Sequence, residues 1–125
     1  MEQQAYDHLL EVEQVAQAMV VRFKRRTILE PNSIRAIGHR LLRLAGEEGR
    51  RTILVNFSGV ESMTSAMLGE FAVLQRVLND SGGHLAFCCV EPFLMQVFKV
   101  VKISEHIAIH ADEETALQAL SPAAP

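Results

Sequence analysis

Three hydroxyl side chains, Ser62, Thr64 and Ser65, gather where an apolar run ends and a helical pattern begins. Residues 52–57 are apolar and β-branched, as in a strand covered on both faces, and the pattern over residues 64–79 predicts a helix. A helix N-terminus presents unpaired N–H groups and the positive end of the helix dipole, so it favours anions, including a phosphate on a hydroxyl. From this local pattern alone, such hydroxyls are most often simple helix caps.

The two sides of this predicted helix differ in character. On a helical wheel, four large apolar side chains fall within one narrow arc that is expected to face a sheet: Met67, Phe71, Leu74 and Leu78. The opposite side is small and nearly flat, with one cation: Ser65, Gly69, Ala72 and Arg76. A partner backbone could approach such a surface closely, and a phosphate on Ser65 would disturb that approach through bulk and charge.

The cysteines and histidines are the other residues that could do chemistry. Cys88 and Cys89 lie in an expected strand, where neighbours point to opposite faces, so they are expected to be small buried thiols and not a disulfide. His106 and His110 would share a helix face, but the isoleucines around them favour a strand, which separates the rings by ~13 Å at ~3.3 Å per residue. No metal site is therefore expected. The sequence contains no phosphate-binding loop with spaced glycines, no nucleophile elbow and no acid–base pair of carboxylates. We therefore expect that the protein is not an enzyme and that it has no cofactor.

The elements that must position these residues alternate along the chain. Strands and helices are expected in the order ββαβαβαβα at residues 9–15, 18–23, 32–46, 52–57, 64–79, 85–90, 93–101, 107–111 and 112–120. Asn32 is the expected cap of the first helix, and Gly46 is its expected left-handed end. Alternation of this kind predicts an α/β fold with a mainly parallel sheet.

The helix at residues 93–101 has apolar residues at helical spacing, which are expected in the core: Phe93, Leu94, Val97, Phe98 and Val101. Surplus exposure of Phe93 or of Met95 would instead indicate a docking patch.

Composition limits the classes of function. The 125 residues fit one domain, with a lead-in at residues 1–8, the domain at 9–120 and a frayed tail at 121–125. The net charge of −3 argues against nucleic-acid binding, and the basic residues within 22–26 are expected to be solvated edges. No apolar run approaches the roughly 20 residues that span a bilayer, and no signal-peptide pattern occurs, so a cytoplasmic protein without direct membrane insertion is expected.

The stretch from Asn56-Phe57-Ser58-Gly59-Val60 to Met63-Thr64-Ser65-Ala66-Met67-Leu68-Gly69 resembles the signature of the STAS family, the anti-sigma factor antagonists. Gly82-Gly83-His84-Leu85, Pro92 and the segment 107–117 extend the resemblance over roughly residues 9–120. The resemblance implies a small, mixed, mostly parallel sheet with helices packed on one side.

The resemblance also implies a function: a module that binds an anti-sigma factor or a serine-protein kinase of the histidine-kinase-ATPase type. In the family, phosphorylation of the first serine at the helix start blocks that binding. By position this serine is Ser65, and Thr64 is the rival acceptor. Where many members have Asp, Ser and Gly, this chain has Thr64, Ala66 and Met67; Thr64 is still expected to cap the helix, without adding a charge.

The expected partner-binding residues lie at and beyond the helix start: Ser62, Thr64, Ser65, Gly69, Ala72 and Arg76. Two alternatives remain open, namely a STAS subunit of a lipid-transport ABC complex and a STAS domain that senses a small ligand or nucleotide. A homodimer is possible through the first β-hairpin if that hairpin forms a sheet edge.

Overall fold

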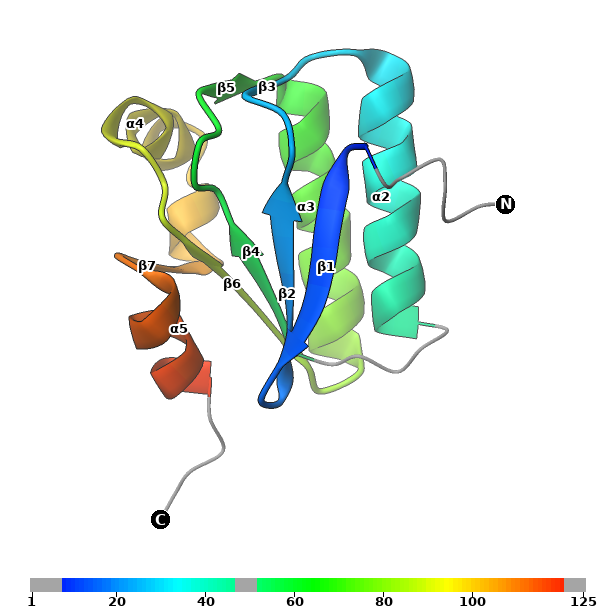
Figure 1. Cartoon of the computed structure of the whole chain (residues 1–125), viewed down its shortest axis with the longest axis vertical. Helices are drawn as coiled ribbons and strands as arrows, with labels where there is room; N and C mark the ends of the chain where they lie inside the picture. Colours follow the sequence, from blue (N-terminus) through cyan, green and yellow to red (C-terminus); the bar gives the residue numbers. More distant parts are fainter. Residues whose placement is uncertain (1–7, 47–51, 121–125) are drawn as a thin grey trace.

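The computed structural model describes residues 8–46 and 52–120 (Figure 1). The predicted tail at 121–125, and the predicted lead-in apart from His8, lie outside the described residues. The elements are β1 (Leu10–Val15), β2 (Ala18–Phe23), β3 (Thr27–Ile28), α2 (Pro31–Gly46), β4 (Thr52–Asn56), β5 (Ser62–Met63), α3 (Ser65–Asp80), β6 (His84–Cys88), α4 (Pro92–Val100), the 3-10 helix η1 (Ile103–Glu105), β7 (Ala108–His110) and α5 (Glu113–Leu120). Each described helix is too short or too polar to cross a bilayer.

The main sheet has five strands in the order β1-β2-β4-β6-β7. The β1–β2 hairpin is antiparallel and turns at Ala16, which has a positive φ of 55°. The other neighbours run parallel, which confirms the predicted α/β class and the order of its main elements. The sequence did not predict the second, two-stranded sheet, in which β3 pairs with β5 in parallel.

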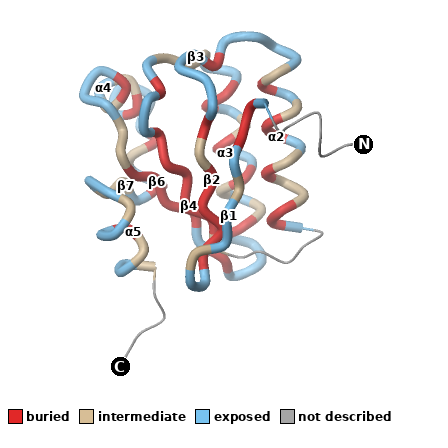
Figure 2. The backbone as a smooth tube through the Cα atoms, in the orientation of Figure 1, coloured by how far each residue is buried: buried red, intermediate tan, exposed pale blue. Residues whose placement is uncertain are grey.

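Helices cover both faces of the main sheet (Figure 1). Val21, Val55 and Phe87 point into the larger core, which α2, α3 and α4 complete. Alternate residues of the same strands form a second buried cluster with Ala116 of α5. The prediction of helices on one side therefore holds for three helices, whereas α5 lies on the other face. Burial on both faces explains why these strands are almost continuously apolar, as the buried lengths of β2, β4 and β6 show in Figure 2.

Five phenylalanine rings lock the carboxyl end of β4 to its surroundings. The ring of Phe57, directly after β4, lies with its centroid 4.8 Å from that of Phe87 and 5.5 Å from those of Phe23 and Phe98. Phe71 of α3 is 5.7 Å away. Tilted and edge-on pairs of this kind add to the stabilisation from burial. This cluster holds the loop that leads into α3 against the core.

Two predicted ends of α2 are wrong. The helix begins at Pro31, so Asn32 lies inside its first turn and is not the cap. Proline suits this position because its missing N–H would be unpaired there in any case. Gly46 is the last helical residue and does not take the left-handed conformation, which among the described glycines occurs at Gly59 and Gly82.

Candidate functional site

The loop between β4 and α3 is held in place by hydrogen bonds that its backbone N–H groups donate. Its first turn is closed by the Ser58 N–H, which donates to Asn56 Oδ1 at 2.8 Å, and by the positive φ of Gly59. Further along, the Thr64 N–H donates to the Ile28 carbonyl at 3.2 Å, which ties the start of α3 to β3. These bonds leave α3 with a defined starting point.

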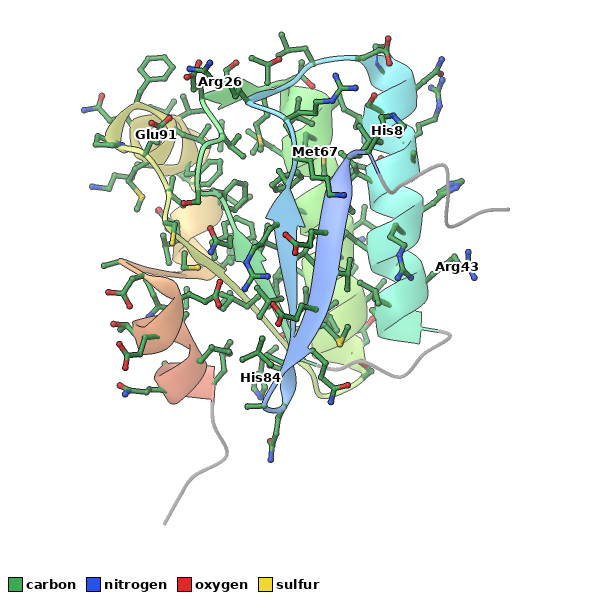
Figure 3. The ribbon with its side chains drawn as sticks, viewed as in Figure 1. His8, Arg26, Arg43, Met67, His84 and Glu91 are labelled. Carbon is green, nitrogen blue, oxygen red and sulfur yellow. The ribbon has the colours of Figure 1, made fainter. Side chains whose placement is uncertain are left out.

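An ion pair reinforces the same end of the molecule. Arg26 Nη2 lies 2.7 Å from Glu61 Oε2 and joins the chain before β3 to the chain before β5. In Figure 3, Arg26 lies toward the same end of the molecule as Glu91, the residue before α4. Arg26 and Glu61 are both exposed, so their ion pair adds little stability and mainly restricts the loop.

The hydroxyls of Thr64 and Ser65 have different surroundings. Thr64 is the residue before α3 and its carbonyl accepts from the N–H groups of Met67 and Leu68, but its side chain forms no cap. Its Oγ1 is buried without a hydrogen-bond partner. The prediction that the Thr64 hydroxyl caps the helix is therefore wrong. Ser65, the first helical residue, is exposed, so of these two adjacent hydroxyls it is the one that an enzyme can reach.

The predicted division of α3 into two faces is confirmed. The inner residues Met67, Phe71, Leu74 and Leu78 are all at most 1% exposed. On the other side, four residues are all exposed, and they are called the outer ridge here: Ser65, Gly69, Ala72 and Arg76. A methyl group added at Gly69 would meet nothing within 4 Å, so this glycine leaves open space above the helix. Ser62, half-buried in β5, lies off the ridge.

The outer ridge forms one wall of a groove of about 630 Å³. The opposite wall is the segment after α4, with Val101, Lys102, Ile103, His106 and Ile107. This space is called the α3 groove below. Lys102 has a positive φ of 64°, which turns the chain from α4 into η1. The two walls are joined where Gln75 Nε2 donates to the His106 carbonyl at 3.2 Å.

The helix that precedes this wall is less buried than the sequence predicted. Leu94 and Phe98 are core residues, as expected, but Phe93 is 70% exposed and Val101 is 49% exposed. The core prediction for these two residues is wrong, because α4 is covered on one side only. Met95 is half-buried. The exposure of Phe93 is the feature expected of a docking patch.

The sequence missed a polar cluster beneath α5. Glu113 accepts from Arg22 Nη2 at 2.9 Å and 3.0 Å and from Asn56 Nδ2 at 2.8 Å. Arg22 also pairs with Glu13 at 2.8 Å, so it is no solvated edge. The hydrogen bonds to Glu13 and Glu113 raise the pKa of Arg22. A charged or amide residue inside an otherwise apolar strand is the signal that could have revealed this cluster, because buried polar groups need partners.

The cysteines and histidines differ from the strand geometry that was expected. Cys89 follows β6 with a positive φ of 62°, so its Sγ lies 3.6 Å from Cys88 Sγ and the two side chains do not point to opposite faces. Burial is the main cause that raises the pKa of the Cys88 thiol. His106 follows η1, and His110 ends β7. Within residues 8–46 and 52–120, no three His, Cys, Asp or Glu side chains are grouped as metal ligands.

Comparison with known proteins places this architecture in a family. The STAS domain pattern matches residues 10–116. The anti-sigma-factor antagonist (STAS) domain protein of Planctomyces limnophilus is similar with a TM-score of 0.75 and 23% sequence identity, over 89% of this chain and 97% of the other. The phosphorylated form of the Bacillus cell fate determinant SpoIIAA gives a TM-score of 0.72 and 19% identity, over 90% and 99% of the two chains. The murine anion transporter Slc26a9 gives 0.69 and 10%, over 94% of this chain and 19% of the transporter.

These low identities show a shared fold, whereas the pattern match extends over most of the sequence. The buried strand, the anchored loop and the exposed start of α3 lie within the matched residues. The chain therefore belongs to the STAS domain family.

Proposed function

We propose that this protein is a binding module of the anti-sigma factor antagonist type, and not an enzyme, that is switched by phosphorylation of Ser65. The observation that supports this most directly is the exposure of Ser65 at the head of the outer ridge, on a helix whose start is anchored. The proposed partner is an anti-sigma factor or serine-protein kinase of the histidine-kinase-ATPase type. The names of two similar proteins, an anti-sigma-factor antagonist and a phosphorylated cell fate determinant, support this class.

Charge explains how such a switch would act. A phosphoserine carries about −1.5 to −2 charges at neutral pH. Arg76, the cation of the outer ridge, is eleven residues further along α3, or about 16 Å at a rise of about 1.5 Å per residue. That distance exceeds the Debye length of about 8 Å at physiological ionic strength, so Arg76 would not neutralise the phosphate. The modified surface would present bulk and negative charge to a partner.

The test compares Ser65→Ala, Ser65→Asp and the unmodified chain as baits in the native lysate. The partner is expected to bind Ser65→Asp at least tenfold more weakly than the unmodified chain. It should bind Ser65→Ala about as tightly as the unmodified chain. Ser58→Asp, which adds the same charge at an exposed serine outside α3, is the matched control and should still bind. When the captured kinase is incubated with ATP and this chain, the phosphate should appear on the peptide that contains Ser65. The same result is expected with the Thr64→Val variant. Equal binding of Ser65→Asp and the unmodified chain would refute the switch.

A second candidate uses the same ridge without phosphorylation. The candidate is a STAS subunit of a lipid-transport ABC complex, and the similarity of the fold to part of the murine anion transporter supports a place beside a transporter. The same bait experiment distinguishes the two candidates. A transporter subunit captured equally by Ser65→Asp would support the second.

A further inference from the structure

The α3 groove has an apolar floor between helix α3 and the segment that follows α4. Leu68 of the α3 wall and Ile103 of the opposite wall are each 8% exposed, and Ile107 is 2% exposed. Val101 extends the apolar surface to the rim, where it is 49% exposed. The walls are a helix and a 3-10 turn, so they present side chains and not the free edge of a sheet. A helix laid into the groove suits such walls better than an added strand.

Cations stand on both walls of this groove. Arg76 comes from α3, and Lys102 comes from the segment after α4; both are exposed. Among the residues that the structure describes, neither has a side-chain hydrogen bond or an ion pair, whereas Arg22 and Arg26 are both paired with glutamates. The groove contains one carboxylate, that of Asp80. A chain with a net charge of −3 therefore has a groove with a surplus of positive charge.

We propose that the α3 groove receives an acidic amphipathic helix of the partner protein. Its apolar side would pack on Leu68, Ile103 and Val101, and its carboxylates would face Arg76 and Lys102. This inference rests on the proposed function and specifies the partner of the same site. Complementary charge sets the partner and the orientation, while the apolar floor supplies the contact area.

The groove also links binding to the phosphorylation of Ser65. Ser65 lines one end of the groove, at the start of the 16-residue helix α3. Its phosphate would place about −1.5 to −2 charges at this end of the groove, where Arg76 is too far along α3 to neutralise them. An acidic helix would then be repelled. The charge of the groove thus supplies a reason why the modified chain releases its partner.

The experiment uses the partner that the Ser65→Asp comparison identifies. Arg76→Glu and Lys102→Glu reverse the charge on opposite walls, and neither removes a contact that holds the fold. Each substitution is expected to weaken binding of the partner at least tenfold. Binding of the unmodified chain should also weaken as the salt concentration rises. The matched control is Arg35→Glu on α2, an exposed arginine that donates to Asn32 Oδ1 within its own helix, and it should bind like the unmodified chain. Melting temperatures of all variants separate loss of binding from loss of folding.

Three outcomes separate the possibilities. Weakened binding of both groove variants, together with hydrogen-exchange protection of an acidic helix in the partner, supports the proposal. If Ser65→Asp blocks binding but the groove variants bind as Arg35→Glu does, the switch stands and the groove proposal is overturned; protection of a basic or extended segment overturns it as well. If no partner distinguishes Ser65→Asp from the unmodified chain, the proposed function fails and this inference falls with it.

Discussion

Replacement of Thr64 by valine is expected to stabilise the protein, although threonine at the start of a helix is usually a favourable cap. In this structure Thr64 Oγ1 is buried and has no hydrogen-bond partner. A hydroxyl buried without a partner costs about 1–3 kcal/mol, and valine puts a methyl group of similar shape in its place. The backbone at φ −87° and ψ 166° lies in the extended region that valine prefers.

The expected gain in the free energy of unfolding is about 1 kcal/mol, at the low end of that range because the rest of the Thr64 side chain is only half-buried. For a domain of this size, such a gain raises the melting temperature by roughly 3–5 °C. Urea titration and thermal unfolding followed by circular dichroism measure both quantities. A loss of about 1 kcal/mol, the usual cost of removing a working cap, would show that the hydroxyl caps α3 and would refute the reasoning.

The matched control is the cap of α5, which does form. Asp112 Oδ1 accepts from the Thr115 N–H at 2.8 Å, and this bond, with that from the Thr115 hydroxyl, lowers the pKa of Asp112. Asp112→Ala is therefore expected to lower the melting temperature at neutral pH. A carboxyl group whose pKa is lower in the folded than in the unfolded chain stabilises the folded state at pH values above its pKa in the unfolded chain. This stabilisation is lost as the pH falls through the pKa of the folded chain. The Asp112→Ala difference should thus shrink in acid, while the Thr64→Val gain should not depend on pH.

The remaining predictions concern the other face of the sheet. Glu113→Ala removes the acceptor of the buried Asn56 amide and should lower the free energy of unfolding in urea by about 1–3 kcal/mol, whereas its exposed neighbour Glu114→Ala should change it little. Equal effects of the two substitutions would contradict the role of the polar cluster. Burial raises the pKa of the Cys88 thiol, so iodoacetamide at neutral pH should alkylate Cys89 first and reach Cys88 only on unfolding. Peptide mass mapping over time measures the order, and prior labelling of Cys88 would show that its burial is incomplete.

Patterns within single elements predicted the fold well. The spacing of apolar residues identified the inner and outer faces of α3, and the helix predicted at residues 93–101 is α4, Pro92–Val100. The errors in locating elements fell at element ends and at short elements, and the placement of α5 on the second face of the sheet was not predicted. Asn32 was a plausible cap by type, but Pro31 already begins the helix. The two-residue strands β3 and β5 are too short to produce a periodic pattern, so no sequence rule based on periodicity could find them.

For the candidate site, the sequence alone placed Ser65 on the outer ridge, because the faces of one helix depend only on spacing along that helix. The tertiary structure decided everything that joins distant segments. It placed Lys102 across the groove from Arg76, and it buried the Thr64 hydroxyl while leaving Ser65 exposed. It also brought Glu113 to Asn56, 57 residues away in the chain. Each of these residue types is compatible with many neighbours, and only the packing of the folded chain selects one of them.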